Sequence, residues 1–169
     1  MYMGIPFLIQ SALLADDDQQ KKYWLNEAAS QIIGFYKRPF DKNAGLFRHG
    51  HYSEDTTAPI QHWTRAQGWA TFAMADVLKH LPSDHPLYKT ILERFRTHLE
   101  ICITYQDKES GLWPNILDKP DTKLETSGTA LILLGLSRGI NEGWLDKETF
   151  LEPTEKAWAG LVKNIEADG

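Results

Sequence analysis

The chain has 169 residues, of which 42% are hydrophobic and 24% are charged, and this is the composition of a soluble globular protein with one core. We therefore treat residues 1–169 as a single domain. A formal net charge of −5 excludes the basic surface that nucleic acids and anionic membranes require. With no apolar run near the roughly 20 residues of a membrane span, we expect neither nucleic acid nor membrane as a partner.

The first residues predict a core helix, because they are apolar but lack the basic segment and the cleavage site of a signal peptide. We therefore expect a cytoplasmic protein, with the authentic N-terminus lying further upstream. Cys102 stands in an apolar run and is the only cysteine, so it cannot form an internal disulfide. It is expected to be a small buried hydrophobic residue.

Apolar residues recur every three to four positions in six segments, which predicts six helices. In chain order the helices are expected over residues 5–15, 19–36, 65–80, 86–105, 127–139 and 147–167. The predicted apolar stripe of the second helix comprises Tyr23, Trp24, Ala28, Ile32 and Phe35. That of the sixth comprises Leu151, Trp158, Leu161 and Ile165.

Polar residues before three of these helices predict N-terminal caps, because their side chains accept bonds from free backbone N–H groups. Asp16, Asp17 and Asp18 precede the second helix, where the helix dipole also favours negative charge. Ser83 or Asp84 is expected to cap the fourth. The fifth helix contains four consecutive apolar residues, 131–134, and we expect it to be buried on all sides.

The long connections, residues 37–62 and 106–125, share a motif. Asp41-Lys42-Asn43-Ala44-Gly45-Leu46-Phe47 corresponds to Asp107-Lys108-Glu109-Ser110-Gly111-Leu112-Trp113. Each motif predicts a tight turn in which Asp bonds nearby N–H groups and Gly takes a positive φ. The Leu-aromatic pair that follows, Leu46-Phe47 or Leu112-Trp113, predicts a short strand.

A repeated unit of helix, short turn, helix and long loop predicts helical hairpins that stack beside one another, because one hairpin cannot bury its own apolar face. The long loops then emerge from one end of the stack. Functional residues concentrate on loops that a rigid scaffold holds, so we expect the site at that end.

Two clusters at the ends of the long loops carry candidate binding residues. In the first, Trp63, Arg65 and Trp69 surround the start of the third helix, and Arg65 and Trp69 share a face. Such a group suits a sugar acid, since the guanidinium binds a carboxylate and the indole packs on the sugar ring. An Arg–Trp stack that only braces the helix is the alternative.

In the second cluster, Glu125-Thr126-Ser127 precedes the fifth helix. The Ser or Thr hydroxyl is expected to cap that helix. Glu125 is alternatively placed to bind sugar hydroxyls or to orient Arg65.

Four segments in this order resemble the glycoside hydrolases of family 105, the unsaturated rhamnogalacturonyl hydrolases, to which the family 88 unsaturated glucuronyl hydrolases are related. They are Tyr2-Met3-Gly4-Ile5-Pro6-Phe7-Leu8, Gly45-Leu46-Phe47-Arg48-His49-Gly50, Trp63-Thr64-Arg65-Ala66-Gln67-Gly68-Trp69, and Gly111-Leu112-Trp113 with Leu124-Glu125-Thr126-Ser127. The resemblance covers nearly the whole chain. It implies an all-α fold, the C-terminal part of an (α/α)6 toroid built of helical hairpins, with short strands in the long loops.

The resemblance implies a substrate with a terminal unsaturated uronic acid, left by a lyase on pectin. An aspartic acid protonates the C4=C5 vinyl ether, water adds at C5, and the hemiketal opens. It implies no metal and no cofactor. The implied substrate-binding residues are His49, Trp63, Arg65, Gln67, Trp69, Trp113, Glu125 and Ser127.

The chain departs from the family pattern in two places. The family commonly has Arg-Gly-Asn-Gly-Trp where this chain has Arg65-Ala66-Gln67-Gly68-Trp69, so its specificity is expected to differ. The family's proton-donating Asp precedes the position of Tyr2 and Met3, and here that position falls upstream of Met1. We therefore expect no catalytic residue in the chain and impaired activity.

Two other functions stay open. The chain could be a non-catalytic sugar-binding or scaffold piece that completes its ring as a homo-oligomer, since an open stack exposes apolar edges. A sugar epimerase on a similar toroid would instead require His49 and either His51 or His62 to face one pocket.

Overall fold

The computed structural model describes residues 4–50 and 61–166. Within them the chain forms six helices and four two-residue strands, and all six predicted helices are confirmed. The helices are α1 (Gly4–Leu13), α2 (Asp18–Lys37), α3 (Thr64–His80), α4 (Tyr88–Thr104), α5 (Thr126–Asn141) and α6 (Lys147–Val162). The strands are β1 (Phe40–Asp41), β2 (Leu46–Phe47), β3 (Trp113–Pro114) and β4 (Leu124–Glu125).

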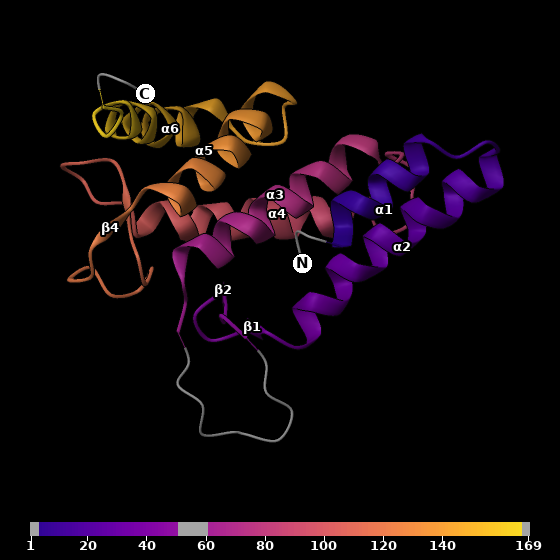
Figure 1. Cartoon of the computed structure of the whole chain (residues 1–169), viewed down its shortest axis with the longest axis horizontal. Coiled ribbons are helices and arrows are strands. Elements are labelled where there is room, and N and C mark those ends of the chain that lie inside the picture. The colour runs from indigo at the N-terminus through magenta and orange to yellow at the C-terminus, as the bar shows by residue number, and fades with distance from the viewer. Residues whose placement is uncertain (1–3, 51–60, 167–169) are drawn as a thin grey trace.

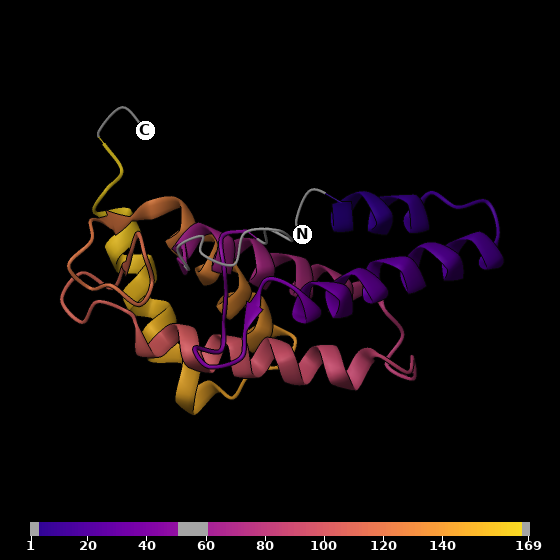
Figure 2. The same ribbon diagram turned by 90° about the horizontal axis from the view of Figure 1, so that it is seen from below.

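Three helical hairpins lie in a row, from α1–α2 at one end through α3–α4 to α5–α6 at the other (Figure 1). The first helices of the hairpins contact one another, α1 against α3 and α3 against α5. Each second helix packs on its own first helix, and the view from below shows α1 running alongside α2 (Figure 2). The hairpins therefore stack as the repeat predicted.

The two repeated motifs form the predicted turns. Gly45 and Gly111 have φ values of 69° and 75°, a region that side chains disfavour. Asp41 Oδ1 accepts the N–H of Asn43 at 2.9 Å, and Asp107 Oδ1 accepts that of Ser110 at 2.8 Å. β1 and β2 pair antiparallel around the first turn, whereas β3 starts one residue later than predicted and pairs with β4.

Glycines let α3 and α5 approach closely at their N-terminal ends. A Cβ on Gly68 would lie 2.6 Å from Leu131 Cβ, and one on Gly128 would lie 2.8 Å from the backbone nitrogen of Arg65. Neither contact is tolerable, so both positions require glycine. This contact brings the start of α3, with Arg65, beside the start of α5, with Ser127.

The cap predictions are confirmed at α2 and wrong at α4. Asp17 caps α2 by accepting the N–H of Gln20 at 2.8 Å. The N-cap of α4 is Leu87, whose side chain makes no capping bond. The ring of His85 bonds beside the start of the helix without capping it: its Nδ1 accepts the N–H of Leu87, the N-cap residue, at 3.1 Å while its Nε2 donates to Asn26 Oδ1 at 2.8 Å. Neither Ser83 nor Asp84 caps the helix.

Three predictions of buried apolar faces are corrected. On α2, Tyr23 is 54% exposed although Ala28 and Ile32 are buried. On α5, Leu134 is exposed while Ile132 and Leu133 are buried. On α6, Leu151 and Trp158 are exposed, and the buried face comprises Phe150, Thr154, Ala157 and Gly160. Ile165 is exposed as well and lies beyond the end of the helix at Val162. On α6 the reason is that apolar residues occur on two faces of the helix, and their periodicity does not determine which face packs against the core.

Candidate functional site

Backbone and side-chain hydrogen bonds join the two long loops at the N-terminal ends of α3 and α5. The N–H of Thr64 donates to the carbonyl of Asn115 at 3.0 Å, and the N–H of Leu117 donates to that of His62 at 2.8 Å. Nε1 of Trp63 donates to Asn115 Oδ1 at 3.1 Å. The two loops therefore form one surface, as the repeat predicted.

Trp63 lies at the centre of this surface, between His49 and Arg65. Its ring meets that of His49 edge to face, with centroids 5.1 Å apart. The guanidinium carbon of Arg65 lies 4.1 Å from the centroid of the Trp63 ring, a cation–π contact. The His49, Trp63 and Arg65 side chains thus form a continuous stack that connects the first loop to α3.

Glu125 and Ser127 hold the guanidinium of Arg65 from the start of α5. Nη1 of Arg65 donates to Ser127 Oγ at 2.9 Å and lies 3.4 Å from Glu125 Oε1. The Ser127 hydroxyl also donates to Glu125. Because only one of the two terminal nitrogens is used in these bonds and the side chain is 39% exposed, Arg65 retains donors for a ligand.

Glu125 is also the N-cap of α5, since its carboxylate accepts the N–H of Gly128. The prediction that a Ser or Thr hydroxyl caps α5 is therefore wrong, because the carboxylate of Glu125 caps the helix. The hydroxyl of Ser127 bonds Glu125 and Arg65 instead. Glu125 was expected either to bind sugar hydroxyls or to orient Arg65, and the structure contains the contact with Arg65.

A cavity of about 680 Å³ opens on Trp63 and extends to α2, within the range of small-ligand sites. Phe35, Phe47, Trp63 and Trp69 line it with aromatic surface, and Arg38 and Arg48 with positive charge. His49 lines it as well. The cavity thus unites three predicted residues, His49, Trp63 and Trp69. Among its described lining residues there is neither Arg65 nor any carboxylate.

Arg48 belongs to one of the family-like segments without a predicted role, and in the structure it pairs with a carboxylate. Its Nη2 lies 3.3 Å from Asp41 Oδ2. The same oxygen is 3.6 Å from Nε2 of the buried His62, whose Nδ1 is 2.8 Å from Asp118 Oδ2. These four residues form a continuous series of polar contacts that begins at Arg48 in the lining of the cavity. The sequence places Asp41 and His62 near opposite ends of the first long loop and Asp118 in the second, and no motif connects them.

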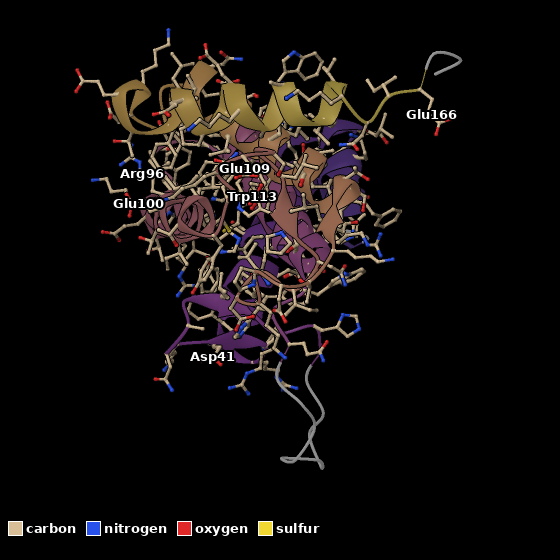
Figure 3. All side chains as sticks on the ribbon, turned by 90° about the vertical axis from the view of Figure 1, so that its left-hand side faces the viewer. Asp41, Arg96, Glu100, Glu109, Trp113 and Glu166 are labelled. Atoms are coloured by element: carbon tan, nitrogen blue, oxygen red, sulfur yellow. The ribbon has the colours of Figure 1, made fainter. Side chains whose placement is uncertain are left out.

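The environment of Asp41 keeps its carboxyl group ionised. Burial alone would raise its pKa, but the N–H groups of Asn43 and Ala44 and the Arg48 guanidinium outweigh burial and hold the pKa below its ordinary value. An ionised Asp41 fixes the position of Arg48. Figure 3 shows Asp41 at the turn between β1 and β2, well apart from Trp113, which lies among the helices.

Two predicted binding residues are fully buried. Both amide atoms of Gln67 bond the backbone of Phe47: Oε1 accepts the N–H at 2.9 Å and Nε2 donates to the carbonyl at 2.6 Å. Trp113 is 0% exposed, and its Nε1 donates to the carbonyl of Cys102 at 2.7 Å. Gln67 fastens β2 to α3 and Trp113 packs in the core. Direct contact of Gln67 or Trp113 with a sugar stays a prediction, and the burial of both side chains argues against it.

The histidine pair of an epimerase does not form among the described residues. His49 is exposed and lines the cavity, whereas His62 is buried and is held between Asp41 and Asp118. His51 lies outside the described residues.

Residues 4–50 and 61–166 contain no group of three or more His, Cys, Asp or Glu side chains that could bind a metal ion. None of the helices within these ranges has the length and apolar character to cross a membrane. Cys102 is fully buried, as expected, and burial raises the pKa of its thiol.

The sequence matches Glycosyl Hydrolase Family 88 over residues 1–169. It is 33% identical over 155 residues to an unsaturated 3S-rhamnoglycuronyl hydrolase of Alteromonas sp., covering 88% of this chain and 35% of the relative. It is 36% identical over 108 residues to an unsaturated rhamnogalacturonyl hydrolase of Bacillus subtilis, covering 64% and 29%. The chain thus spans about a third of the length of these curated relatives.

A solved structure from Salmonella enterica, described as a possible member of the GH105 family, superposes with a TM-score of 0.85 at 26% identity. The match covers 97% of this chain and 42% of that one. This likeness, together with the six helices, confirms the predicted all-α, toroid-like fold.

Proposed function

The chain belongs to Glycosyl Hydrolase Family 88, and from this premise we propose that it recognises oligosaccharides that end in an unsaturated uronic acid. The stack of His49, Trp63 and Arg65 at the shared loop surface carries the proposal. Arg65 is held by Ser127 and Glu125 but stays partly exposed, as a carboxylate-binding residue must be. The curated relatives are named as hydrolases of such sugars.

Binding would join a charged and an apolar contact. The guanidinium of Arg65 pairs with the uronate carboxylate through two parallel N–H bonds. The Trp63 ring, which lies against Arg65, packs on the apolar face of the sugar. The exposed His49 donates to or accepts from a ring hydroxyl. Trp69 extends the aromatic wall inside the cavity.

The reaction of the whole enzyme would be hydration of the C4=C5 vinyl ether. An acid donates a proton to C4 and water adds its oxygen to C5, which gives a hemiketal. The hemiketal opens, the C–O bond to the leaving sugar breaks, and that sugar departs as an alcohol. The donor must be protonated when it acts.

We assign no described residue of the chain as that donor. The described lining of the cavity contains no carboxylate. Of the acidic residues that pair with the arginines of the site, Glu125 caps α5 and bonds Arg65, and Asp41, which pairs with Arg48, is ionised. We therefore propose that the 169-residue chain binds the sugar but turns it over slowly.

The binding test is calorimetry with an unsaturated uronate disaccharide. Arg65→Gln should weaken binding by roughly tenfold or more, since a bond to a charged group is lost. Arg138→Gln is the matched control, because Arg138 pairs with Asp76 at 3.4 Å near the opposite end of α5. Equal affinities for wild type and Arg65→Gln would overturn the assignment.

The turnover test follows the loss of ultraviolet absorbance from the double bond. Slow or undetectable loss is expected for the 169-residue chain at a substrate concentration that saturates binding. Rapid loss would show that the chain contains its own proton donor and that our assignment of the acidic residues is wrong.

A second candidate is a sugar-binding or scaffold piece that completes its ring with a second copy of the chain. Large apolar side chains are exposed at both ends of the row of hairpins. They are Phe7, Leu13, Leu14 and Tyr23 at one end, and Leu151, Trp158, Val162 and Ile165 at the other. Two such ends facing each other would bury apolar area.

A further inference from the structure

We propose that a second cavity, between α2, α4 and the β1–β2 turn, binds a small 2-hydroxycarboxylate that carries a flat apolar body. The carboxylate pairs with Arg94, the hydroxyl group bonds the ring of His98, and the apolar body packs on Tyr36 and Phe40, all of which line this cavity. The site lies apart from the surface that carries the proposed function, and it does not require the chain to bind sugars.

The second cavity has a volume of about 510 Å³, which is within the range of small-ligand sites. Phe47 separates it from the cavity beside Trp63. Phe47 lines the cavity beside Trp63, and its ring packs on those of Tyr36, Phe40 and His98, with centroids 4.9 Å, 5.2 Å and 5.5 Å apart. These three rings line the second cavity. The two cavities are therefore distinct sites on either side of one side chain.

The guanidinium of Arg94 contains a donor that no described residue satisfies. Its carbon lies 4.3 Å from the centroid of the Tyr36 ring, and the Tyr36 hydroxyl donates to the backbone carbonyl of Arg94 at 3.3 Å. These contacts hold Arg94 against α2. Its Nη1 is buried and has no hydrogen-bond partner in the described part of the chain. A buried donor without a partner is unfavourable, and a carboxylate in the cavity would satisfy it with a charge-assisted bond.

His98 lies one helical turn beyond Arg94, on the same face of α4. Its side chain is 2% exposed, and burial keeps it neutral by lowering its pKa to about 4. Nε2 is 3.3 Å from the carbonyl of Gln67, whereas Nδ1 has no hydrogen-bond partner among the described residues. A hydroxyl group both donates and accepts, so it can bond Nδ1 whichever ring nitrogen carries the proton. Because the two side chains are neighbours on the helix, a hydroxyl and a carboxylate on adjacent carbons suit them.

The charge and the wall of the cavity decide the rest of the ligand. Its described lining has two cations, Lys42 and Arg94, and one carboxylate, that of Glu93, in a chain with a formal net charge of −5. An anion is therefore favoured over a cation. Beside these charges the rings of Tyr36 and Phe40 lie with centroids 4.6 Å apart. Aromatic rings pack well on another flat apolar group, so the carboxylate should carry one.

Three probes of similar shape test the two polar contacts by calorimetry. Mandelate carries the phenyl body, the hydroxyl and the carboxylate. Phenylacetate lacks the hydroxyl, and mandelamide lacks the charge. The wild-type chain should bind mandelate roughly threefold more tightly than phenylacetate and roughly tenfold more tightly than mandelamide. If mandelate does not bind, or if either preference is missing, the site is overturned.

Variants of the two polar residues assign each preference to its side chain. Arg94→Met should remove the preference for mandelate over mandelamide and keep the preference over phenylacetate. His98→Phe retains a ring beside Phe47 but contains no nitrogen, and it should remove only the preference over phenylacetate. A folded Arg94→Met or His98→Phe variant that keeps both preferences overturns the site.

Two exposed positions test the same site without disturbing the core. Lys42→Met removes a cation from the lining and should weaken mandelate binding, whereas Glu93→Gln removes an anion and should strengthen it. Lys89→Met is the matched control, because Lys89 is exposed on α4 and lies outside the described lining. If Lys89→Met weakens binding as much as Lys42→Met does, or if neither Lys42→Met nor Glu93→Gln changes it, the site is overturned.

The cavity beside Trp63 also contains arginines and aromatic rings, so a further variant decides between the two cavities. Arg38→Met combined with Arg48→Gln removes both positive charges there, and the glutamine keeps a donor for Asp41. This double variant should bind mandelate as tightly as the wild-type chain does. A loss as large as that in Arg94→Met would mean that mandelate binds beside Trp63, and the second site would be overturned.

Discussion

At the scale of single residues, the burial of a side chain decides whether it can bind a ligand or only stabilises the fold. Arg65 and Gln67 are two positions apart on α3, and the family resemblance implies a sugar contact for both. Arg65 is partly exposed beside Ser127. Gln67 is fully buried, with its amide bonded to Phe47. On a helix, two residues apart means nearly opposite directions, so one faces the loops and the other faces the core.

Gln67→Ala should therefore act on stability. It removes two hydrogen bonds to the Phe47 backbone and leaves that N–H and carbonyl buried without partners, at a cost of about 1–3 kcal/mol for each group. Urea unfolding checks this, and calorimetry of the folded variant should give a sugar affinity within about threefold of wild type. A large loss of affinity at unchanged stability would restore Gln67 as a sugar contact.

His98 predicts a pH dependence of stability. Burial lowers its pKa to about 4, with the backbone groups of Gln67 and Gly45 opposing the shift, whereas the ordinary value is about 6.5. The unfolded chain thus binds more protons between these two values. The contribution of His98 is complete above pH 6.5 and is lost as the pH falls toward 4, at most about 1.4 kcal/mol per pH unit.

His98→Gln keeps a donor for the Gln67 carbonyl but cannot titrate. Chemical unfolding at several pH values should show a shallower loss of stability for this variant between pH 6.5 and 4. His80 and His85, whose pKa values burial also lowers, are present in both proteins, so the difference in slope isolates His98. Parallel slopes would contradict a neutral His98 in the fold.

At the scale of elements, the second of the two repeated turns requires glycine for two reasons, its backbone conformation and its close contact with α6. Gly111 has a φ of 75°, and a Cβ there would clash with the carbonyl of Lys156 on α6. Gly143 has a similar φ of 71° with open space around it. Substitutions at the two glycines therefore distinguish the cost of backbone strain from the cost of a steric clash.

Gly143→Ala should cost about 1–2 kcal/mol, the penalty of the left-handed backbone alone. Gly111→Ala should cost about 2–5 kcal/mol, because the second turn or α6 must also move. Thermal or urea unfolding of the two variants measures the difference. Equal losses would mean that α6 moves away from this turn at no cost.

At the scale of the whole molecule, the row of hairpins leaves apolar side chains exposed at its two ends. Trp158 on α6 is 62% exposed, with Leu151 and Val162 on the same helix. In the proposed second function a further copy of the chain covers these side chains. Apolar patches of this kind mark contact surfaces.

If so, sedimentation velocity should show self-association that increases with protein concentration. Trp158→Gln should reduce it, and Glu93→Gln, on an exposed position of α4, should not. A monodisperse wild-type monomer at high concentration would contradict ring completion by a second copy.

The sequence by itself determined the local structure. Periodicity located six helices, and the spacing within the Asp41 and Asp107 motifs predicted two turns with glycine at positive φ. The order of helices and long loops predicted the stacked hairpins and their common loop end. These features depend on residues close in the chain, so the sequence contains their physical causes.

Only the tertiary structure decided which faces are covered and which distant side chains meet. It exposed Trp158 and Tyr23, buried Gln67 and Trp113, and left α4 without the expected side-chain cap. It also placed Asp41, His62 and Asp118 in one chain beneath Arg48. The physical reason is that burial and ion pairing arise from the packing of separate elements, and spacing along one element does not encode its neighbours.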